Sequence, residues 1–124
     1  MKYRLSFTLN GETVDVLVKP TDTLLDILRE NLHVMSPKRG CDTGDCGTCT
    51  VLIEGEPILS CLTIALTVAG KDVKTVESFI SKEGQLHPLQ QSFHEHYAAQ
   101  CGFCTPGMLI SSKALLDKNP EPSE

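Results

Sequence analysis

The feature that most constrains this chain is a block of three cysteines within nine residues, CDTGDCGTC at positions 41–49. The spacing is C-x4-C-x2-C, and a fourth cysteine follows at position 61. Three thiolates from one loop and a fourth from a neighbouring segment form the plant-type 2Fe–2S pattern. Glycines at 40, 44 and 47 suit such a loop, because it must wrap an anionic cluster closely and point backbone N–H groups at the sulfurs. The pattern predicts a cluster with four ligands: Cys41, Cys46, Cys49 and Cys61.

Two other uses of these thiols are open at this point. A structural zinc site usually pairs two C-x2–4-C knuckles, whereas Cys61 stands alone in this sequence. Disulfides are compatible with an even count of six cysteines, but the N-terminal segment MKYRLSFTLNGETVDV lacks the apolar core of a signal peptide. Thiols stay reduced in the cytoplasm. We therefore favour iron–sulfur ligation and expect a cytoplasmic protein.

Charge and hydropathy exclude several classes of partner. The formal net charge is −5, whereas nucleic-acid and anionic-membrane surfaces need clustered Lys and Arg. The longest basic run is Lys38-Arg39, which either docks a partner or offsets the negative charge of a cluster. Apolar stretches are far shorter than a membrane span. We expect neither nucleic acid nor membrane among the partners.

The first half of the chain has the pattern of a mixed sheet with one helix across it. Asn10-Gly11 separates two alternating apolar segments and is a strong hairpin signal. Thr21 or Asp22 is expected to cap a helix whose leucines recur at helical spacing. Strands are predicted at residues 3–9, 14–18, 50–53 and 73–76.

Beyond residue 78 the strand signals vanish and two helical stretches flank a second cysteine pair, CGFC at 101–104. The second helix is expected to begin at Thr105-Pro106, with the threonine as its cap. A CGFC pair also occurs in thioredoxin-like redox motifs, but those follow a strand, and here a helix is expected before it. The first helix carries an apolar stripe that we expect to face a core, formed by Leu89, Phe93 and Tyr97.

Several other polar side chains resemble ligands or catalytic groups. His87, His94 and His96 are expected to face solvent or a partner, because residues two apart on a helix point in different directions. Asp42 and Asp45 lie beside thiolates with no evident base nearby. We expect them to be exposed loop residues.

Two long segments carry a resemblance to a known family. KRGCDTGDCGTCTVLIEGEPILSCLTIA, together with HPLQQSFHEHYAAQCGFCTPGM, resembles the iron–sulfur subunit of the molybdenum hydroxylases, the superfamily of xanthine dehydrogenase, aldehyde oxidoreductase and carbon monoxide dehydrogenase. The resemblance runs from Leu5 to the end of the sequence. It implies an α+β fold with an N-terminal β-grasp, ferredoxin-like domain and a small all-α domain, each binding a 2Fe–2S cluster. We place them at residues 1–78 and 79–124.

The resemblance also implies roles for individual residues. The first four cysteines would hold the cluster nearer the flavin, and Cys101 and Cys104 would supply half of the cluster nearer the molybdenum cofactor. Gln100 would hydrogen-bond molybdopterin. Electrons would pass from a large molybdenum-cofactor subunit through both clusters to a medium subunit that binds FAD. This chain would be a non-catalytic electron-transfer subunit of the oxidoreductase.

The sequence departs from the family pattern at the second cluster. Six cysteines make one complete ligand set and leave two over. In the family the other two ligands come from a later C-x-C, whereas this sequence ends at NPEPSE, which resembles a linker with Ser123 about to cap another helix. We therefore expect a fragment, with the last two ligands beyond residue 124. The alternative is a single-cluster variant in which the second pair stays free, forms a disulfide or accepts a partner's ligands.

Two other functions compete with this interpretation. A free-standing ferredoxin-like carrier would need one 2Fe–2S cluster and only the first domain, so the helical half favours docking into a larger enzyme. A zinc-stabilised interaction module is the third option. The resemblance implies that the substrate is chosen at the molybdenum site of another chain.

Overall fold

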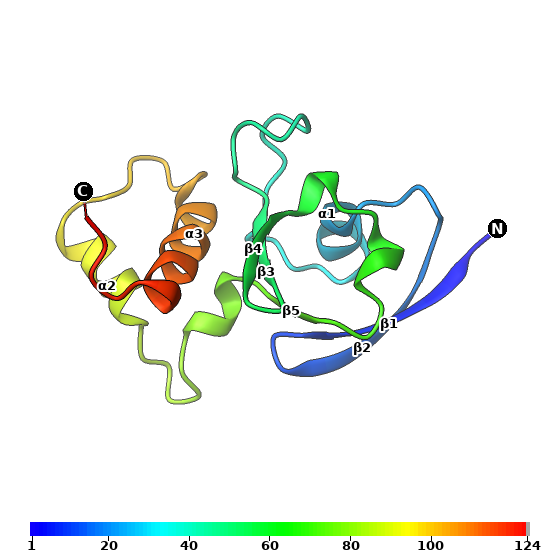
Figure 1. Cartoon of the computed structure of the whole chain (residues 1–124), viewed down its shortest axis with the longest axis horizontal. Helices are drawn as coiled ribbons and strands as arrows, with labels where there is room; N and C mark the ends of the chain where they lie inside the picture. The colour runs from blue at the N-terminus through cyan, green and yellow to red at the C-terminus, as the bar shows by residue number, and fades with distance from the viewer. Residues whose placement is uncertain (124) are drawn as a thin grey trace.

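A computed structural model describes residues 1–123 and confirms the α+β architecture. A mixed five-stranded sheet carries helix α1 on one side, and helices α2 and α3 form a second lobe beyond its other side (Figure 1). The strands are β1 (Tyr3–Leu9), β2 (Glu12–Val18), β3 (Thr50–Ile53), β4 (Glu56–Leu59) and β5 (Asp72–Lys74). The helices are α1 (Leu24–Asp26), α2 (Pro88–Glu95) and α3 (Thr105–Lys118). The strand order is β2-β1-β5-β3-β4, with β1 and β5 parallel and the other neighbours antiparallel.

The predicted N-terminal hairpin is confirmed. Strands β1 and β2 pair antiparallel, with Phe7 opposite Val14. Asn10 and Gly11 both have positive φ angles, 51° and 87°, as a type I′ turn requires. Alternate residues of β1 are buried, so one face of the hairpin contributes to the core.

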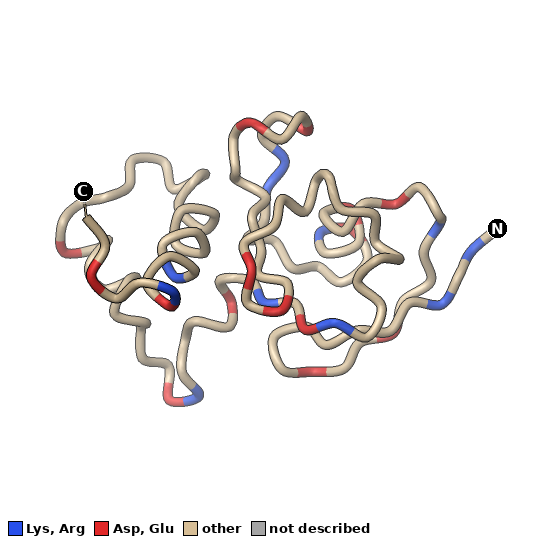
Figure 2. Tube along the Cα trace, viewed as in Figure 1, with Lys and Arg blue, Asp and Glu red and all other residues tan. Residues whose placement is uncertain are grey.

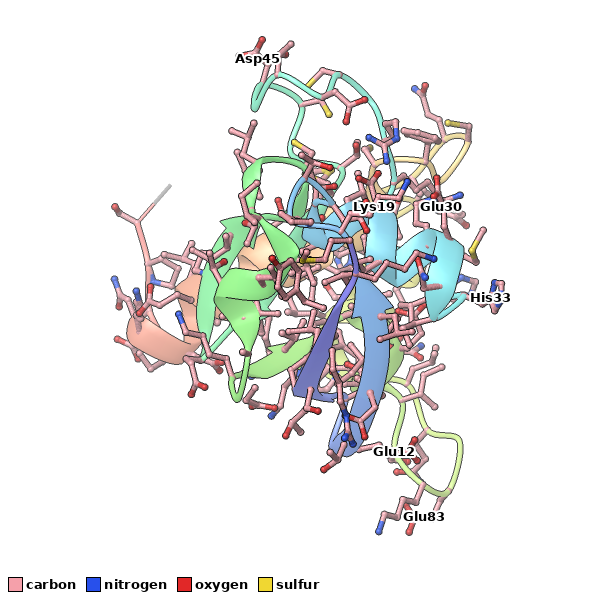
Figure 3. All side chains as sticks on the ribbon, turned by 90° about the vertical axis from the view of Figure 1, so that its right-hand side faces the viewer. Glu12, Lys19, Glu30, His33, Asp45 and Glu83 are labelled. Carbon is pink, nitrogen blue, oxygen red and sulfur yellow. The ribbon has the colours of Figure 1, made fainter. Side chains whose placement is uncertain are left out.

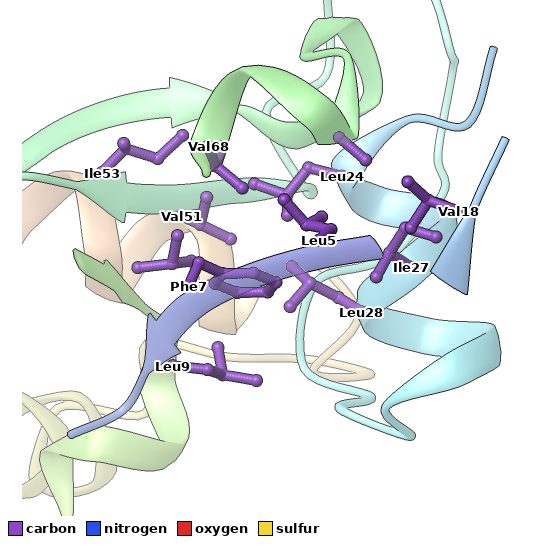
Figure 4. Packing of buried hydrophobic residues seen from close by; sticks show 12 residues of the cluster. Leu5, Phe7, Leu9, Val18, Leu24, Ile27, Leu28, Val51, Ile53 and Val68 are labelled. Atoms are coloured by element: carbon purple, nitrogen blue, oxygen red, sulfur yellow. The ribbon is translucent and has the colours of Figure 1, made fainter. Parts of the chain in front are cut away.

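Helix α1 begins later than predicted. Thr23, and not Thr21 or Asp22, is the N-cap, and it forms a capping box with Asp26. The Asp22 carboxylate instead accepts a hydrogen bond from the Lys19 N–H in the preceding turn. The α-helical part is short and continues as a π-helical turn over Ile27–Asn31. Leu24, Ile27 and Leu28 of this segment pack in the main core with residues of β1 and β3, as shown in Figure 4.

The last strand ends before its predicted limit at Val76. The Thr75 N–H donates to the Asn10 side chain at 2.8 Å, and the Asn10 amide donates back to the Thr75 hydroxyl at 2.9 Å. These bonds take Thr75 out of the ladder, and a 3-10 turn follows over Val76–Phe79. The segment that leaves the sheet after β5 is therefore hydrogen-bonded to the turn of the first hairpin.

The second lobe packs on β3 through its own apolar cluster. Leu52 of β3 contacts the buried face of α3, and this cluster comprises Leu52, Phe79, Leu109, Ile110 and Ala114. Leu89 and Phe93 of α2 pack against it, as predicted, whereas Tyr97 lies beyond the helix end with a positive φ angle and is 91% exposed. The expected core position of Tyr97 is therefore wrong. It fails because α2 ends at Glu95, so the helical spacing does not extend to Tyr97.

Helix α3 begins at Thr105, but its cap is Cys104. Thr105 therefore occupies the first helical position, and within residues 1–123 its buried hydroxyl has no hydrogen-bond partner. Among the helices of those residues, none combines the length and apolar character needed to cross a membrane. Basic and acidic residues are interspersed over much of the trace, but residues 84–112, which include the second cysteine pair, carry Glu95 as their one charged side chain of these types (Figure 2).

Candidate metal centre

The first cysteine block lies on a loop that projects from the sheet next to β3 (Figure 1). Its base is closed by two hydrogen bonds between Lys38 and Thr48. The Lys38 N–H donates to the Thr48 carbonyl at 3.0 Å, and the Thr48 hydroxyl donates to the Lys38 carbonyl at 3.0 Å. Thr48 is buried, so the base is fixed while the tip remains accessible.

Arg39 ties the loop to helix α1. Its guanidinium forms one ion pair with Asp26 and a second with Asp42 at 2.6 Å. Asp42 has a φ of 57°, in the left-handed region that aspartate tolerates better than most residues. These two ion pairs link the first cysteine loop to the N-terminal turn of α1 and place positive charge beside the loop.

Cys41 receives the densest set of hydrogen bonds. The backbone N–H groups of Thr43, Asp45 and Cys46 all donate to its Sγ atom at 3.3 Å. The Thr43 hydroxyl and then these backbone donors lower the pKa of the Cys41 thiol to about 6. The loop is thus shaped to stabilise a thiolate at this position, which is the form that binds metal.

Cys49 and Cys61 lie together on the buried side of the loop. Both are buried against Leu25. The Ser60 hydroxyl donates to the Cys49 carbonyl at 2.6 Å and brings the second segment alongside the first. Burial, followed by the hydrogen bond and negative charge of Cys49, raises the pKa of Cys61 to about 11. Cys41 acts on Cys61 in the same direction, so three of the predicted ligands are close enough to oppose one another's ionisation.

Cys46 is oriented differently from the other three. Its Sγ lies 3.1 Å from the Thr48 hydroxyl oxygen. Gly40 faces it, and a Cβ atom at Gly40 would stand 2.6 Å from that sulfur. Within residues 1–123 no three His, Cys, Asp or Glu side chains converge tightly enough to hold a single metal ion.

The residues nevertheless fit an iron–sulfur cluster. The donor set is entirely thiol, backbone N–H groups point at the Cys41 sulfur, and the buried pair Cys49 and Cys61 packs on apolar side chains. In the described part of the chain, all six cysteines carry unbridged thiols.

The second cysteine pair lies in the turn between α2 and α3, as expected. Cys101 and Cys104 are both exposed, and Gly102 between them has a φ of 84°. Gln100 lines a pocket of about 360 Å³ together with both cysteines. A helix precedes the pair, so the thioredoxin-like arrangement does not apply.

The histidines are scattered, and one has a structural role that the sequence interpretation missed. The His87 Nδ1 atom accepts a hydrogen bond from the Leu89 N–H at 3.1 Å, which caps α2, and its ring packs on Phe79. Burial and then the charge of Lys113 lower its pKa. His87 is thus a half-buried capping residue, whereas the sequence predicts a side chain that faces solvent or a partner, and its position directly before Pro88 was the available signal for a cap.

The remaining polar candidates are exposed. His94 and His96 lie on the open side of α2 and beyond its end. Asp45 stands at the outer tip of the loop in Figure 3 and accepts a hydrogen bond from the Thr43 hydroxyl. Neither carboxylate of the loop is placed for acid–base chemistry.

Two family models together match nearly the whole chain. Residues 7–75 match a 2Fe-2S iron-sulfur cluster binding domain, and residues 75–124 match a second model described as a [2Fe-2S] binding domain. The prediction of two 2Fe–2S-binding domains is confirmed, and iron–sulfur ligation is favoured over zinc.

The chain is similar to small subunits of several oxidoreductases. It is 42% identical to the nicotinate dehydrogenase small FeS subunit of Eubacterium barkeri, covering 99% of this chain and 78% of that protein. It is 46% identical to the 6-hydroxypseudooxynicotine dehydrogenase complex subunit beta of Paenarthrobacter nicotinovorans, covering 93% and 71%.

Solved structures agree with this similarity. A chain of quinoline 2-oxidoreductase from Pseudomonas putida 86 matches with a TM-score of 0.94 and 45% identity, covering 98% of this chain and 75% of the other. Aldehyde oxidoreductase from Desulfovibrio desulfuricans matches with a TM-score of 0.91 and 44% identity, covering 97% of this chain but only 13% of that one. In the second case the similarity therefore spans a small part of a much longer polypeptide.

Proposed function

Because the chain belongs to the family of iron–sulfur small subunits of the molybdenum hydroxylases, we propose that it relays electrons from a molybdenum centre to FAD, both held by partner subunits. The chain itself is a non-catalytic electron-transfer subunit of an oxidoreductase complex. The proposed direction is from a large molybdenum-cofactor subunit, through two 2Fe–2S clusters, to a medium FAD-binding subunit.

The first cluster is assigned to Cys41, Cys46, Cys49 and Cys61. The three backbone N–H groups at Cys41 stabilise negative charge on that sulfur. The apolar surroundings of the two inner cysteines keep water from the site. Cys46 can join the set by a rotation of its side chain away from Thr48. A 2Fe–2S cluster bound there supplies reversible one-electron redox chemistry.

The second cluster is assigned to the helical domain. Cys101 and Cys104 provide two of its ligands, and two further thiolates must come from outside the six cysteines of this sequence. Gln100, directly before Cys101, is proposed to contact molybdopterin of the partner. We propose domain limits of 1–78 and 79–124, while the two family models meet at residue 75. A cytoplasmic location is proposed from the unbridged thiols.

The observation that carries this function is the succession of two different 2Fe–2S-binding domains over one short chain. A free-standing carrier with one cluster would need only the first. Here α3 of the second domain is packed onto β3 of the first through buried side chains, so the two domains form one folded unit. The chemistry of the relatives differs from nicotinate to quinoline and aldehydes, so the substrate belongs to the partner.

Co-purification of the protein from its native source tests the proposal. We expect two larger subunits, one with a molybdenum cofactor and one with FAD, and about four iron atoms per copy of the iron–sulfur subunit. Electrons supplied at the molybdenum centre should reduce both clusters before the flavin. Isolation of the protein by itself, active as a soluble carrier, would contradict the proposal.

A further inference from the structure

Residue 107 is a glycine because of the space available to it and not because of its backbone conformation. It lies in the first turn of α3 and is absent from the residues with positive φ angles. Alanine would favour the helix at such a position, because glycine leaves more backbone freedom to be lost on folding. The presence of glycine at position 107 must therefore reflect a requirement other than helix formation.

That requirement is direct contact with the first cysteine loop. A Cβ atom at Gly107 would stand 2.4 Å from the carbonyl oxygen of Gly47 and 3.2 Å from the Cα atom of Thr48. Gly47 lies between two of the proposed ligands of the first cluster, and Gly107 lies three residues after Cys104. The backbones that carry the two cysteine sets thus touch, and only a residue without a side chain allows this approach.

A second contact joins the same two segments. The Lys38 ammonium group, at the base of the first loop, donates to the Phe103 carbonyl at 3.2 Å. It also lies 5.4 Å from the centroid of the Phe103 ring. Phe103 is one of the two residues between Cys101 and Cys104, and it directly precedes Cys104. Lys38 therefore bridges one cysteine segment to the other with a hydrogen bond and a cation–π contact.

The space between the two contacts is shared by thiols of both sets. Cys46 and Cys104 line one pocket of about 250 Å³, together with Gly47 and Gly107. The first cysteine loop therefore turns one side toward α3, and Cys104 of the second pair lies on that same side.

We propose that Gly107 and Lys38 are positioning residues that fix the separation of the two clusters and so set the electronic coupling between them. This inference rests on the proposed function, since it concerns electron transfer between the two clusters of one chain. A methyl group at Gly107 would need about 1 Å of displacement to reach an ordinary contact of 3.4 Å with the Gly47 oxygen, from the 2.4 Å that its Cβ would have. The helix and the loop would move apart by that amount.

The test is Gly107→Ala in the assembled complex, with both clusters reduced and their magnetic interaction measured by electron paramagnetic resonance. Dipolar interaction falls with the cube of separation, so the splitting should narrow and electron transfer between the clusters should slow. Iron content and the absorbance of each cluster should stay unchanged. Ser111→Ala is the matched control, because Ser111 lines the same pocket one turn further along α3 and is exposed.

Substitution of Lys38 gives an independent test, because it leaves the sequence of α3 unchanged. Lys38→Met keeps the aliphatic stem but removes the donor and the charge, and should also narrow the splitting, whereas Lys38→Arg should restore it. An unchanged splitting in both Gly107→Ala and Lys38→Met would overturn the inference and leave the proposed function intact. Failure of the unsubstituted complex to show two clusters would instead refute the proposed function, and the inference with it.

Discussion

The attachment of α3 to the sheet depends on Ile110, and its replacement tests the two-domain unit most sharply. Ile110 is 1% exposed and lies in the cluster that contains Leu52 of β3 and Phe79. Ile110→Ala removes buried carbon atoms and leaves a cavity, which costs about 2–5 kcal/mol of unfolding free energy in a core of this kind. Cores of domains this small rarely supply more than about 3–5 kcal/mol in total. The substitution should therefore detach α3 from the sheet.

Equilibrium unfolding in urea, followed by far-ultraviolet circular dichroism, measures this loss. Leu115→Ala is the control, because Leu115 lies on the same helix and is 51% exposed. Its cost should stay within about 0.5 kcal/mol, as for other surface substitutions. Because α3 begins beside Cys104, we also expect Ile110→Ala to release the second cysteine pair from the first loop.

Similar losses for the two variants would refute this reasoning. That result would mean that the α3–β3 contact contributes little, and that the helical lobe is held by something other than its buried face. A loss of about 2 kcal/mol or more for Ile110→Ala alone would support it.

Three further predictions concern single side chains. Cys49→Ser should abolish most of the visible absorbance of the first cluster, and a full spectrum would remove Cys49 from the ligand set. The lowered pKa of His87 means that the unfolded chain binds more protons below about pH 6.5, so stability should fall as the pH drops through that region. His87→Asn keeps a capping acceptor and should flatten this pH dependence of the urea midpoint, whereas an unchanged slope would place the effect elsewhere. Thr105→Val removes a buried hydroxyl that lacks a partner within residues 1–123, so stability should be equal or higher, and a loss above about 1 kcal/mol would contradict this.

Local sequence patterns predict the hairpin and β3 well, because the residues that specify each of these elements lie close together in the sequence. Asn10-Gly11 has the φ angles that its sequence indicates, and the run from Thr50 to Ile53 forms a buried strand. The cysteine spacing predicts the ligand quartet, and of its members Cys49 and Cys61 share one buried cluster, while Cys41 is near enough to raise the pKa of Cys61. The orientation of Cys46 toward Thr48 carried no sequence signal.

Features that depend on distant contacts were beyond local reasoning. Thr75 leaves the sheet because Asn10, 65 residues earlier, binds both its N–H and its hydroxyl. The sequence indicates a partner contact or a charge offset for Lys38, whereas in the structure its ammonium group donates to the carbonyl of Phe103, 65 residues further along the chain. The role of Gly107 is visible only when the loop is seen against the helix, because its φ angle is ordinary.

The most direct test of the account is the metal content of the protein purified without oxygen, read together with its visible and paramagnetic spectra. We predict a brown protein with about four iron atoms per copy in the complex, about two of them bound by the first cysteine quartet, and a paramagnetic signal that develops on one-electron reduction. A colourless protein that binds zinc after reconstitution with iron and sulfide would contradict the central claim.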